Sequence, residues 1–334
     1  MQFGYSDLCL AHDPGERHPE SADRLRAIKR GLQKRHGVSY HDADRADASA
    51  VKAVHESAYV EEVQEFCASG GGSWDPDTIA VEKTWEAALQ SAGLAQWAAM
   101  EALDGADGRQ TPFSIGRPPG HHAVEDDAMG FCFFNNAAVA AQAAIDDTGI
   151  DRVAIFDWDV HHGNGTQDIF YDRDDVFYAS IHEDGLYPGT GDRDEIGTGD
   201  GERTTLNAPL AAGAGDADFL YVIDEAIAPA LEAFEPELVI ISAGFDAHQH
   251  DPISRMRVST EGYALMTARM QSLQASLDMP LAFVLEGGYG LDTLSEGVSI
   301  VHETFDGREP MPCEDDPTDK TKAIVSELRT ALDL

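Results

Sequence analysis

The chain has 334 residues, of which 43% are hydrophobic and 25% are charged, and it contains no homopolymer, heptad run or internal repeat. This composition excludes collagen, a coiled coil and wholesale disorder. Lys and Arg number 23 against 61 Asp and Glu, so the formal net charge is −38 and no basic stripe is available for direct binding to nucleic acid. Such an acid excess indicates a salt-rich cytosol, where counterions screen the repulsion, and we therefore expect a halophilic protein.

Cysteine usage and hydropathy bear on the compartment. The four cysteines, Cys9, Cys67, Cys132 and Cys313, form no close pair, which argues against a thiolate zinc site. The first residues, MQFGYSDLCL, lack the basic and apolar regions of a signal peptide. No apolar stretch approaches the ~20 residues that a membrane span needs. We therefore expect a reduced, cytoplasmic protein with no membrane partner.

Predicted helices and strands alternate along the chain. Helical spacing of apolar residues predicts helices at 20–35, 56–68, 84–103, 135–146, 218–234, 262–277 and 323–332. Continuous apolar runs of strand length lie at 111–115, 152–157, 176–181, 238–244 and 281–288. Such runs are typical of parallel strands that are buried on both faces. The alternation predicts an α/β fold, a doubly wound and mostly parallel sheet with helices on both faces.

No segment of the sequence is long enough to act as a linker between two domains. A single domain is therefore predicted over residues 1–334, with a catalytic core of about 10–305. Residues 306–334 would form an acidic, proline-containing tail, which crosses the surface as a strap and ends in the last predicted helix.

Ionisable residues or glycines follow all five apolar runs. In open α/β sheets, ligands bind in the crevice beyond the carboxyl ends of the strands. The motifs at these positions are RPPGHH at 117–122, DWDVHHGNG at 157–165, HEDGLYPG at 182–189, GFDAH at 244–248 and EGGYG at 286–290. Their convergence predicts a functional site at this edge of the sheet. For any one carboxylate taken alone, the alternative is that it caps the helix that follows its strand.

Two of these motifs contain residues of the kind that bind catalytic metals. Asp159 and His161 are two positions apart, so their side chains point to the same side if the strand remains extended. With Asp246 they form a set of nitrogen and oxygen ligands that leaves a coordination position open, as in catalytic sites. A divalent ion held there would lower the pKa of bound water toward ~7 and polarise a carbonyl.

Histidines and a tyrosine supply the remaining candidates for chemistry. His121 and His122 are adjacent at a strand end, and an imidazole with its ordinary pKa of about 6.5 is suited to act as a general base. The alternative is that both are structural and bond to the backbone. Tyr289 follows two glycines, and its phenol could donate to a developing oxyanion; alternatively, its ring only packs at the rim.

Together, several motifs resemble those of the histone deacetylase family over residues 10 to 305. They are PPGHHA, GFCFFNN, IFDWDVHHGNGTQDIFY, SIHEDGLYPGTGD, SAGFDAH and LEGGYG. Asn164 stands where class I members usually carry Asp, which is similar to class II and to bacterial and archaeal deacetylases. The resemblance implies the arginase/deacetylase-like α/β fold and a hydrolase that cleaves the amide bond of acetylated lysines or polyamines.

The resemblance also implies roles for individual residues. It makes Asp159, His161 and Asp246 the ligands of one zinc ion, or of another divalent ion. It makes His122 the base, bonded to Asn164, and His121 its partner, bonded to Asp157. Tyr289 would polarise the carbonyl. Substrate contacts are expected at Phe131, Tyr187, Gly130, Gly288 and Arg24, where Arg24 resembles the arginine near the acetate exit and Tyr187 departs from the commoner Phe.

Potassium is a further expectation of the resemblance. The site nearest the zinc would use the side chains of Asp157 and Ser180 together with main-chain carbonyls, among them that of Ile181. A binuclear ureohydrolase site is not expected, because Gly163 stands where the Asp-x-His-x-Asp run of arginase would place its second carboxylate.

Three functions remain open from the sequence. The first is a zinc-dependent deacetylase whose partner is an acetylated lysine protein or peptide. The second is an acetylpolyamine deacetylase, whose cationic substrate an acidic rim would attract. The third, from another class, is a non-catalytic acyl-lysine-binding protein. The sequence makes no prediction of the oligomeric state.

Overall fold

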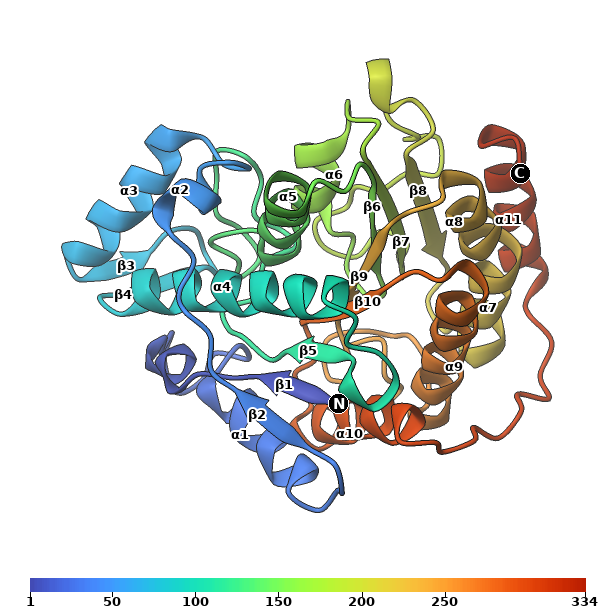
Figure 1. The fold of residues 1–334 in the computed structure, drawn as a ribbon, viewed down its shortest axis with the longest axis horizontal. Helices are drawn as coiled ribbons and strands as arrows, with labels where there is room; N and C mark the ends of the chain where they lie inside the picture. The colour runs from blue at the N-terminus through green and yellow to red at the C-terminus, as the bar shows by residue number, and fades with distance from the viewer.

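The computed structural model describes residues 1–334. Eight strands form one parallel sheet in the order β2-β1-β5-β10-β9-β6-β7-β8, and β3 and β4 form a separate antiparallel pair (Figure 1). The strands are β1 (Gln2–Gly4), β2 (Ser39–His41), β3 (Gly71–Ser73), β4 (Ile79–Val81), β5 (Pro112–Ser114), β6 (Val153–Asp157), β7 (Val176–Glu183), β8 (Thr205–Leu210), β9 (Leu238–Ala243) and β10 (Leu281–Leu285). The prediction of a doubly wound parallel sheet is confirmed.

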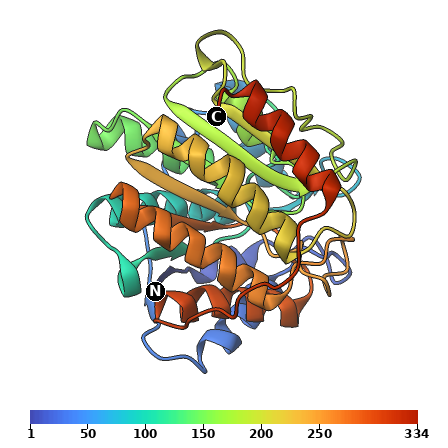
Figure 2. The same cartoon turned by 90° about the vertical axis from the view of Figure 1, so that its right-hand side faces the viewer.

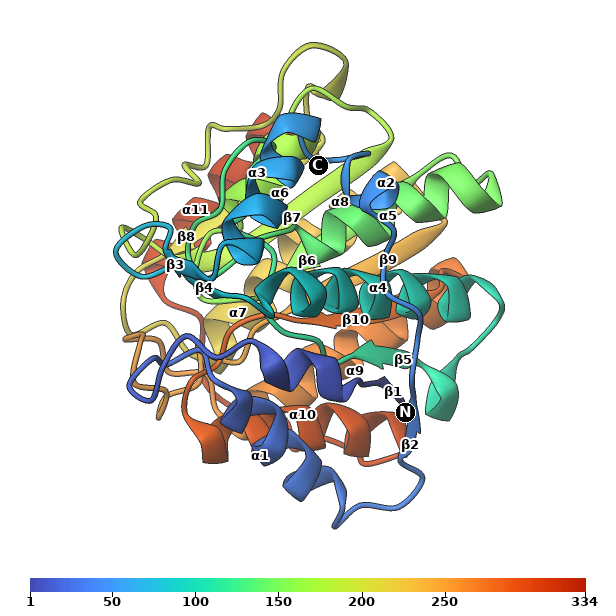
Figure 3. The ribbon, with the colours of Figure 1, turned by 90° about the vertical axis from the view of Figure 1, so that its left-hand side faces the viewer.

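Helices cover both faces of this sheet. They are α1 (Ala22–Leu32), α2 (Ala48–Val51), α3 (Ser57–Ala68), α4 (Thr84–Leu103), α5 (Asn136–Thr148), α6 (Asn164–Phe170), α7 (Asp216–Val222), α8 (Ala228–Phe234), α9 (Thr260–Leu277), α10 (Leu291–Phe305) and α11 (Asp319–Ala331). Figure 3 shows α3, α4 and α5 on one face, whereas Figure 2 shows the opposite face, with α11 in red. A π-helical turn at Ile223–Ile227 joins α7 to α8, so the segment predicted as one helix is continuous but not uniform.

Strand β6 illustrates why the sheet is buried on both sides. All five of its residues are buried. Ala154 and Phe156 belong to the hydrophobic core that α9 and α10 cover, whereas Val153 and Ile155 belong to the core that α4 and α5 cover. Alternate side chains of a strand point to opposite faces of the sheet. A strand with a hydrophobic core on each face therefore needs apolar residues at every position.

The elements that were not predicted are mostly short or irregular. Strands β1 and β2 have three residues each, too few to show a period. Strand β8 contains Pro209, which is tolerated because β8 lies at the edge of the sheet. Helix α10 did carry a signal, since Leu294, Val298 and Val301 are apolar at helical spacing and buried.

The tail is part of the same layered structure. After α10 the chain runs along the surface, where Arg308 pairs with Glu261 (2.6 Å), and α11 then packs against β8 and α7. All four cysteines have free thiols. None of the helices combines the length and the apolar character that crossing a membrane requires.

The order of the central strands determines which loops meet. Strands β5, β10, β9, β6 and β7 are consecutive neighbours, and all run in the same direction. Their carboxyl ends therefore lie along one edge of the sheet, and the five motifs predicted to converge leave the sheet there.

Candidate active site

Asp159, His161 and Asp246 form a compact buried group. One potential ligand atom from each residue lies within 4.8 Å of the others. His161 Nδ1 is 2.9 Å from Asp159 Oδ1 and 3.3 Å from Asp246 Oδ2. The condition under which an extended strand would align Asp159 with His161 does not hold, because β6 ends at Asp157. The chain bends instead, and Asp159 Oδ1 accepts a hydrogen bond from the amide of His161 (2.9 Å).

Two glycines allow the carboxylates to approach the backbone. A Cβ atom at Gly287 would lie 2.1 Å from Asp246 Oδ2 and 2.5 Å from Asp159 Oδ2, and one at Gly244 would lie 2.1 Å from Asp159 Oδ2. The amide of Gly287 also donates to Asp159 Oδ2 (2.8 Å). Both positions therefore need glycine, since any side chain would displace a carboxylate.

The charge balance of this group fits a cation. Asp246 Oδ2 is buried and has no hydrogen-bond partner. Burial raises the pKa of the Asp246 carboxyl, and repulsion from Asp159 raises it further. His161 is a cationic group near both of these buried carboxylates, and such a pair of carboxylates is unfavourable unless further positive charge or a metal ion neutralises it. Two carboxylate oxygens and one imidazole are a donor set that suits zinc.

The paired histidines lie beside this group and differ from each other electrostatically. Their ring centroids are 4.0 Å apart. His121 Nδ1 is 3.0 Å from Asp157 Oδ2. Burial lowers the pKa of His121, but the carboxylates of Asp159 and Asp157 more than offset this and raise it to about 10. A cation bound by Asp159 would weaken that contribution.

His122 has a neutral partner instead. His122 Nδ1 is 2.8 Å from Asn164 Oδ1, so Nδ1 is the donor and Nε2 keeps its lone pair. Burial, followed by the nearby positive charges of His121 and His161, lowers the pKa of His122 well below its usual value. The imidazole of His122 is therefore in the form that can accept a proton.

Aromatic rings flank the histidines and Tyr289. The ring of Phe131 lies 5.7 Å from that of Tyr289, and the ring of Tyr187 lies 5.0 Å from that of His122. Phe131 has φ 71°, a conformation that non-glycine residues seldom adopt and that concentrates at functional sites. A Cβ atom at Gly130 would lie 2.3 Å from His122 Cδ2, so this glycine permits the close packing.

The structure places Arg24 behind Tyr289. Arg24 is fully buried, and its Nε donates to the carbonyl of Gly288 (2.8 Å). Its guanidinium lies 5.0 Å from the centre of the Tyr289 ring. Glu20 neutralises Arg24 (3.3 Å) and also binds Arg117 (2.6 Å). Arg24 thus contacts the loop that carries Tyr289 and Gly288.

The residues expected to bind potassium lie on neighbouring strands. Asp157 of β6 is in register with Ser180 of β7, and Ile181 follows Ser180 in the same strand. All three are buried. Ser180 Oγ is 2.9 Å from His182 Nδ1, and a hydroxyl that donates to His182 still has lone pairs for a cation.

Sequence reasoning missed Glu286 as a member of this site. Strand β10 ends at Leu285, so Glu286 begins the loop rather than lying within the predicted strand. Its Oε2 accepts from the amides of Gly120 (2.7 Å) and His121 (3.2 Å), and its Oε1 accepts from Ser242 Oγ (3.0 Å). Burial and the charge of Asp157 outweigh the lowering effects of His121 and the amides, so that the pKa of Glu286 rises to about 7. An acid directly after a buried apolar run was the available signal.

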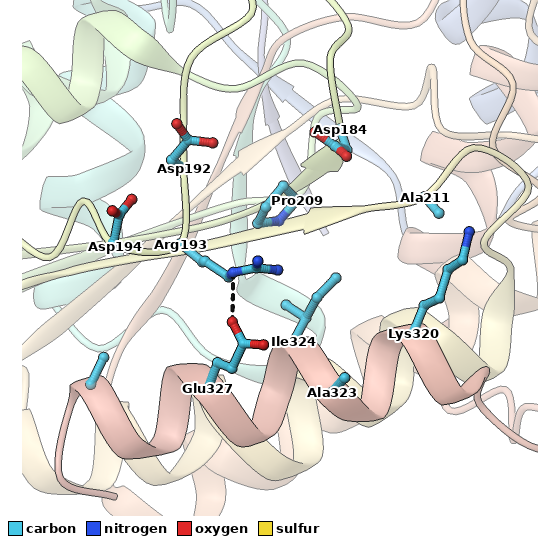
Figure 4. A pocket seen from close by; sticks show the side chains of 11 residues that line it. Asp184, Asp192, Arg193, Asp194, Pro209, Ala211, Lys320, Ala323, Ile324 and Glu327 are labelled. Atoms are coloured by element: carbon cyan, nitrogen blue, oxygen red, sulfur yellow. Dashed lines mark ion pairs between the residues drawn. The ribbon is translucent and has the colours of Figure 1, made fainter.

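A separate hollow of about 710 Å³ lies between α11 and the residues around Pro209 (Figure 4). Arg193 and Glu327 form an ion pair across it (2.6 Å). Its lining residues are Asp184, Asp192, Arg193, Asp194, Pro209, Ala211, Lys320, Ala323, Ile324, Glu327 and Ala331. It includes no histidine, cysteine or tyrosine, so the catalytic candidates belong to the strand-end site.

Comparisons with known proteins agree with this geometry. The model of the histone deacetylase domain family matches residues 18–305. A probable deacetylase of Methanothermobacter thermautotrophicus is 39% identical, and the match covers 91% of this chain and 92% of the relative. The solved structure of the HDA15 HD domain superposes with a TM-score of 0.91 at 34% identity, covering 99% of this chain and 96% of that one. An acetylpolyamine aminohydrolase from Burkholderia pseudomallei superposes with a TM-score of 0.81 at 30% identity, covering 92% and 99% of the two chains.

Proposed function

The chain belongs to the histone deacetylase family, and we propose that it is a zinc-dependent deacetylase that hydrolyses the amide of acetylated lysine side chains. The observation that carries this proposal is the meeting, at one sheet edge, of an Asp-His-Asp group with a neutral histidine. A non-catalytic acyl-lysine-binding protein would not need that combination.

Asp159, His161 and Asp246 would hold a single zinc ion. The unpartnered Oδ2 of Asp246 and the mixed oxygen and nitrogen donors support this assignment. When bound, zinc supplies Lewis acidity toward the scissile carbonyl and the attacking water. A single zinc ion is proposed because Gly163, which has no side chain, stands where a binuclear site would need another carboxylate.

The paired histidines would move the protons. His122 Nε2 accepts a proton as the oxygen of water forms its bond to the carbonyl carbon. The C–N bond then breaks, and the leaving amine takes up a proton from one of the two imidazoles. Asn164 fixes the orientation of His122 without adding negative charge, which keeps its pKa low enough for this exchange.

Tyr289 would stabilise the negative charge that develops on the carbonyl oxygen. Desolvation raises the pKa of its phenol well above the ordinary value. The phenol therefore stays protonated and can donate a hydrogen bond to that oxygen. The rings of Phe131 and Tyr187 would lie on either side of the methylene stem of the substrate, and Gly130 and Gly288 would let the backbone approach it.

A potassium ion is proposed where the end of β6 pairs with β7. The carboxylate of Asp157, the hydroxyl of Ser180 and the carbonyl of Ile181 would supply hard oxygen ligands, which suit an alkali cation. Bound there, the cation would offset part of the negative charge of Asp157, whose pKa burial raises to about 6.

An acetylated polyamine is the second candidate substrate. Burial raises the pKa of the Tyr187 phenol, and the negative charges of Asp77 and Asp75 raise it further. These two carboxylates therefore lie close enough to influence a residue that would flank the substrate. A cationic polyamine would be attracted there, and the likeness to the acetylpolyamine aminohydrolase supports this reading. Acetyl-lysine is preferred because the HDA15 HD domain superposes more closely.

Parallel assays test both substrates. We expect zinc-loaded protein to hydrolyse an acetyl-lysine peptide with a higher kcat/KM than N-acetylputrescine or acetylspermidine. The reverse order would make the protein an acetylpolyamine deacetylase. Binding of acetyl-lysine peptide without any turnover would favour the non-catalytic alternative.

A further inference from the structure

Asp251 has no role in the reaction proposed above, yet its carboxylate contacts the segment that carries Tyr289. It lies in the loop between β9 and α9 and is only 6% exposed. Asp251 Oδ2 accepts hydrogen bonds from the amides of Tyr289 (2.7 Å) and Gly290 (2.8 Å). One buried oxygen therefore fixes the two amides on either side of the Tyr289 α-carbon.

Asp251 also acts on the N-terminus of α10 through its charge. Gly290 precedes α10 and has no side chain with which to bond the first turn. The carboxylate of Asp251 arrives from another loop and places a negative charge at the N-terminus of α10, where the helix dipole favours it. Asp251 Oδ1 meanwhile accepts from the amide of Ile253 (3.1 Å), which holds its own loop in place.

Opposite charges hold the Tyr289 loop from two sides. Arg24 donates to the carbonyls of Glu286 and Gly288, while Asp251 accepts from the amides of Tyr289 and Gly290. Gly288 has φ +113°, a conformation open to glycine, so the loop has little intrinsic preference for one shape. Its shape in the native protein therefore depends on these side-chain contacts.

We propose that Asp251 is a positioning residue for Tyr289, which holds the backbone so that the phenol hydroxyl reaches the carbonyl oxygen of the substrate. The inference rests on the proposed function, in which Tyr289 donates to that oxygen. Without the carboxylate, two amides beside the phenol lose their partner and the loop can relax. A displacement of about 1 Å in a catalytic site can lower the rate by about 10²-fold.

A double-mutant cycle tests this proposal. Asp251→Ala should lower kcat by about 10- to 100-fold and change KM by less than about threefold, because the positioned group acts in the transition state. Asp251→Asn should have a smaller effect, since its carboxamide oxygen can still accept. In a Tyr289→Phe background, Asp251→Ala should lower kcat by less than about threefold, because the hydroxyl that it positions is already absent.

Asp218 provides a matched control. It lies on α7 and is 5% exposed, and its carboxylate accepts from the amides of Gly215 (3.1 Å), which precedes α7, and Thr318 (2.8 Å) in the tail. Asp218→Ala should lower the unfolding midpoint as Asp251→Ala does, but leave kcat within about twofold of wild type. Hydrogen exchange at the amides of Tyr289 and Gly290 should accelerate by about tenfold or more in Asp251→Ala. It should accelerate by a smaller factor, about threefold or more, in Asp251→Asn, because a neutral oxygen accepts more weakly than a carboxylate, and it should stay unchanged in Asp218→Ala.

Three outcomes would overturn the inference. One is a loss of kcat on Asp251→Ala substitution that is as large in the Tyr289→Phe background as in the wild-type protein. Another is an equal loss in the Asp218→Ala and Asp251→Ala proteins. The third is unchanged amide exchange in Asp251→Asn, which also decides the matter if Asp251→Ala does not fold. Wild-type turnover in Tyr289→Phe alone would instead refute the proposed role of the phenol, and with it this inference.

Discussion

The carboxylates buried at the site of this protein differ from those on its surface because they have fixed hydrogen-bonding partners. Asp157 is bonded to His121, Asp159 to His161, and Glu286 to the amides of Gly120 and His121. Burial then sets their charge state, because desolvation and a fixed neighbour each shift a pKa strongly. These carboxylates can therefore carry chemistry.

The carboxylates on the surface mostly lack such partners. With 61 acids and 23 basic residues in the chain, complete pairing is impossible. Where pairs do form, as between Arg269 and Asp224 (2.8 Å), both side chains are about two-fifths exposed, and such pairs stabilise a protein little. The surface acids thus act through their summed repulsion, which depends on salt rather than on geometry.

Removing an interior carboxylate should have the largest effect. Asp246→Asn takes one negative charge from the Asp-His-Asp group, so we expect loss of tight metal binding and activity below detection. Metal content and turnover of the purified variant measure this. The surface variant Glu232→Gln, on α8, is the control and should keep both. Equal metal content and turnover in the two variants would show that interior and surface carboxylates do not differ in function.

Removing the phenol hydroxyl should have the next largest effect. Tyr289→Phe should lower turnover by about 10²–10³, as loss of one oxyanion donor does, while KM changes little. Steady-state kinetics on the acetyl-lysine peptide measure both constants. Tyr221→Phe, at a half-buried phenol on α7, should behave as wild type. A Tyr289→Phe enzyme within about twofold of wild-type turnover would leave Tyr289 with a packing role only.

Adding an interior carboxylate should have a moderate effect. Asn164→Asp places a negative charge beside His122 Nδ1 and should raise the His122 pKa by about 1–3 units. The base must be neutral to accept a proton, so the acidic limb of the kcat/KM profile should move to higher pH. A profile that does not move would show that His122 is not the titrating base.

Screening the surface should have the smallest effect per residue. The screening length falls from about 30 Å at 0.01 M salt to about 3 Å at 1 M, and the folded state packs its charges closer than the unfolded chain does. We therefore expect the unfolding midpoint to rise between about 0.05 and 3 M potassium chloride, a range over which the screening length falls several-fold. A larger rise than in sodium chloride would favour the potassium site. A flat or falling midpoint would argue against salt adaptation.

The sequence predicted the parts of the fold in which one strong pattern suffices. The central strands β6, β7, β9 and β10 are buried on both faces, and their continuous apolar runs were interpreted as parallel strands of this kind. Strands β1 and β2 were missed because pairing with neighbours, rather than their own residues, determines such short strands.

For the site, the sequence predicted which residues meet but not how they meet. Residue types at strand ends identified the Asp-His-Asp group and the paired histidines. The bend after Asp157, which joins Asp159 to His161, depends on packing against Gly244 and Gly287. The contact between Asp251 and the Tyr289 loop joins two distant segments, and no local pattern in either one indicates it.

Metal titration of chelator-treated protein tests the central claim most directly. The stripped protein should be inactive toward an acetyl-lysine peptide. One equivalent of zinc per chain should restore activity, and Asp246→Asn should not respond. A requirement for two equivalents of manganese, or full activity in the stripped protein, would contradict a catalytic site with one zinc ion.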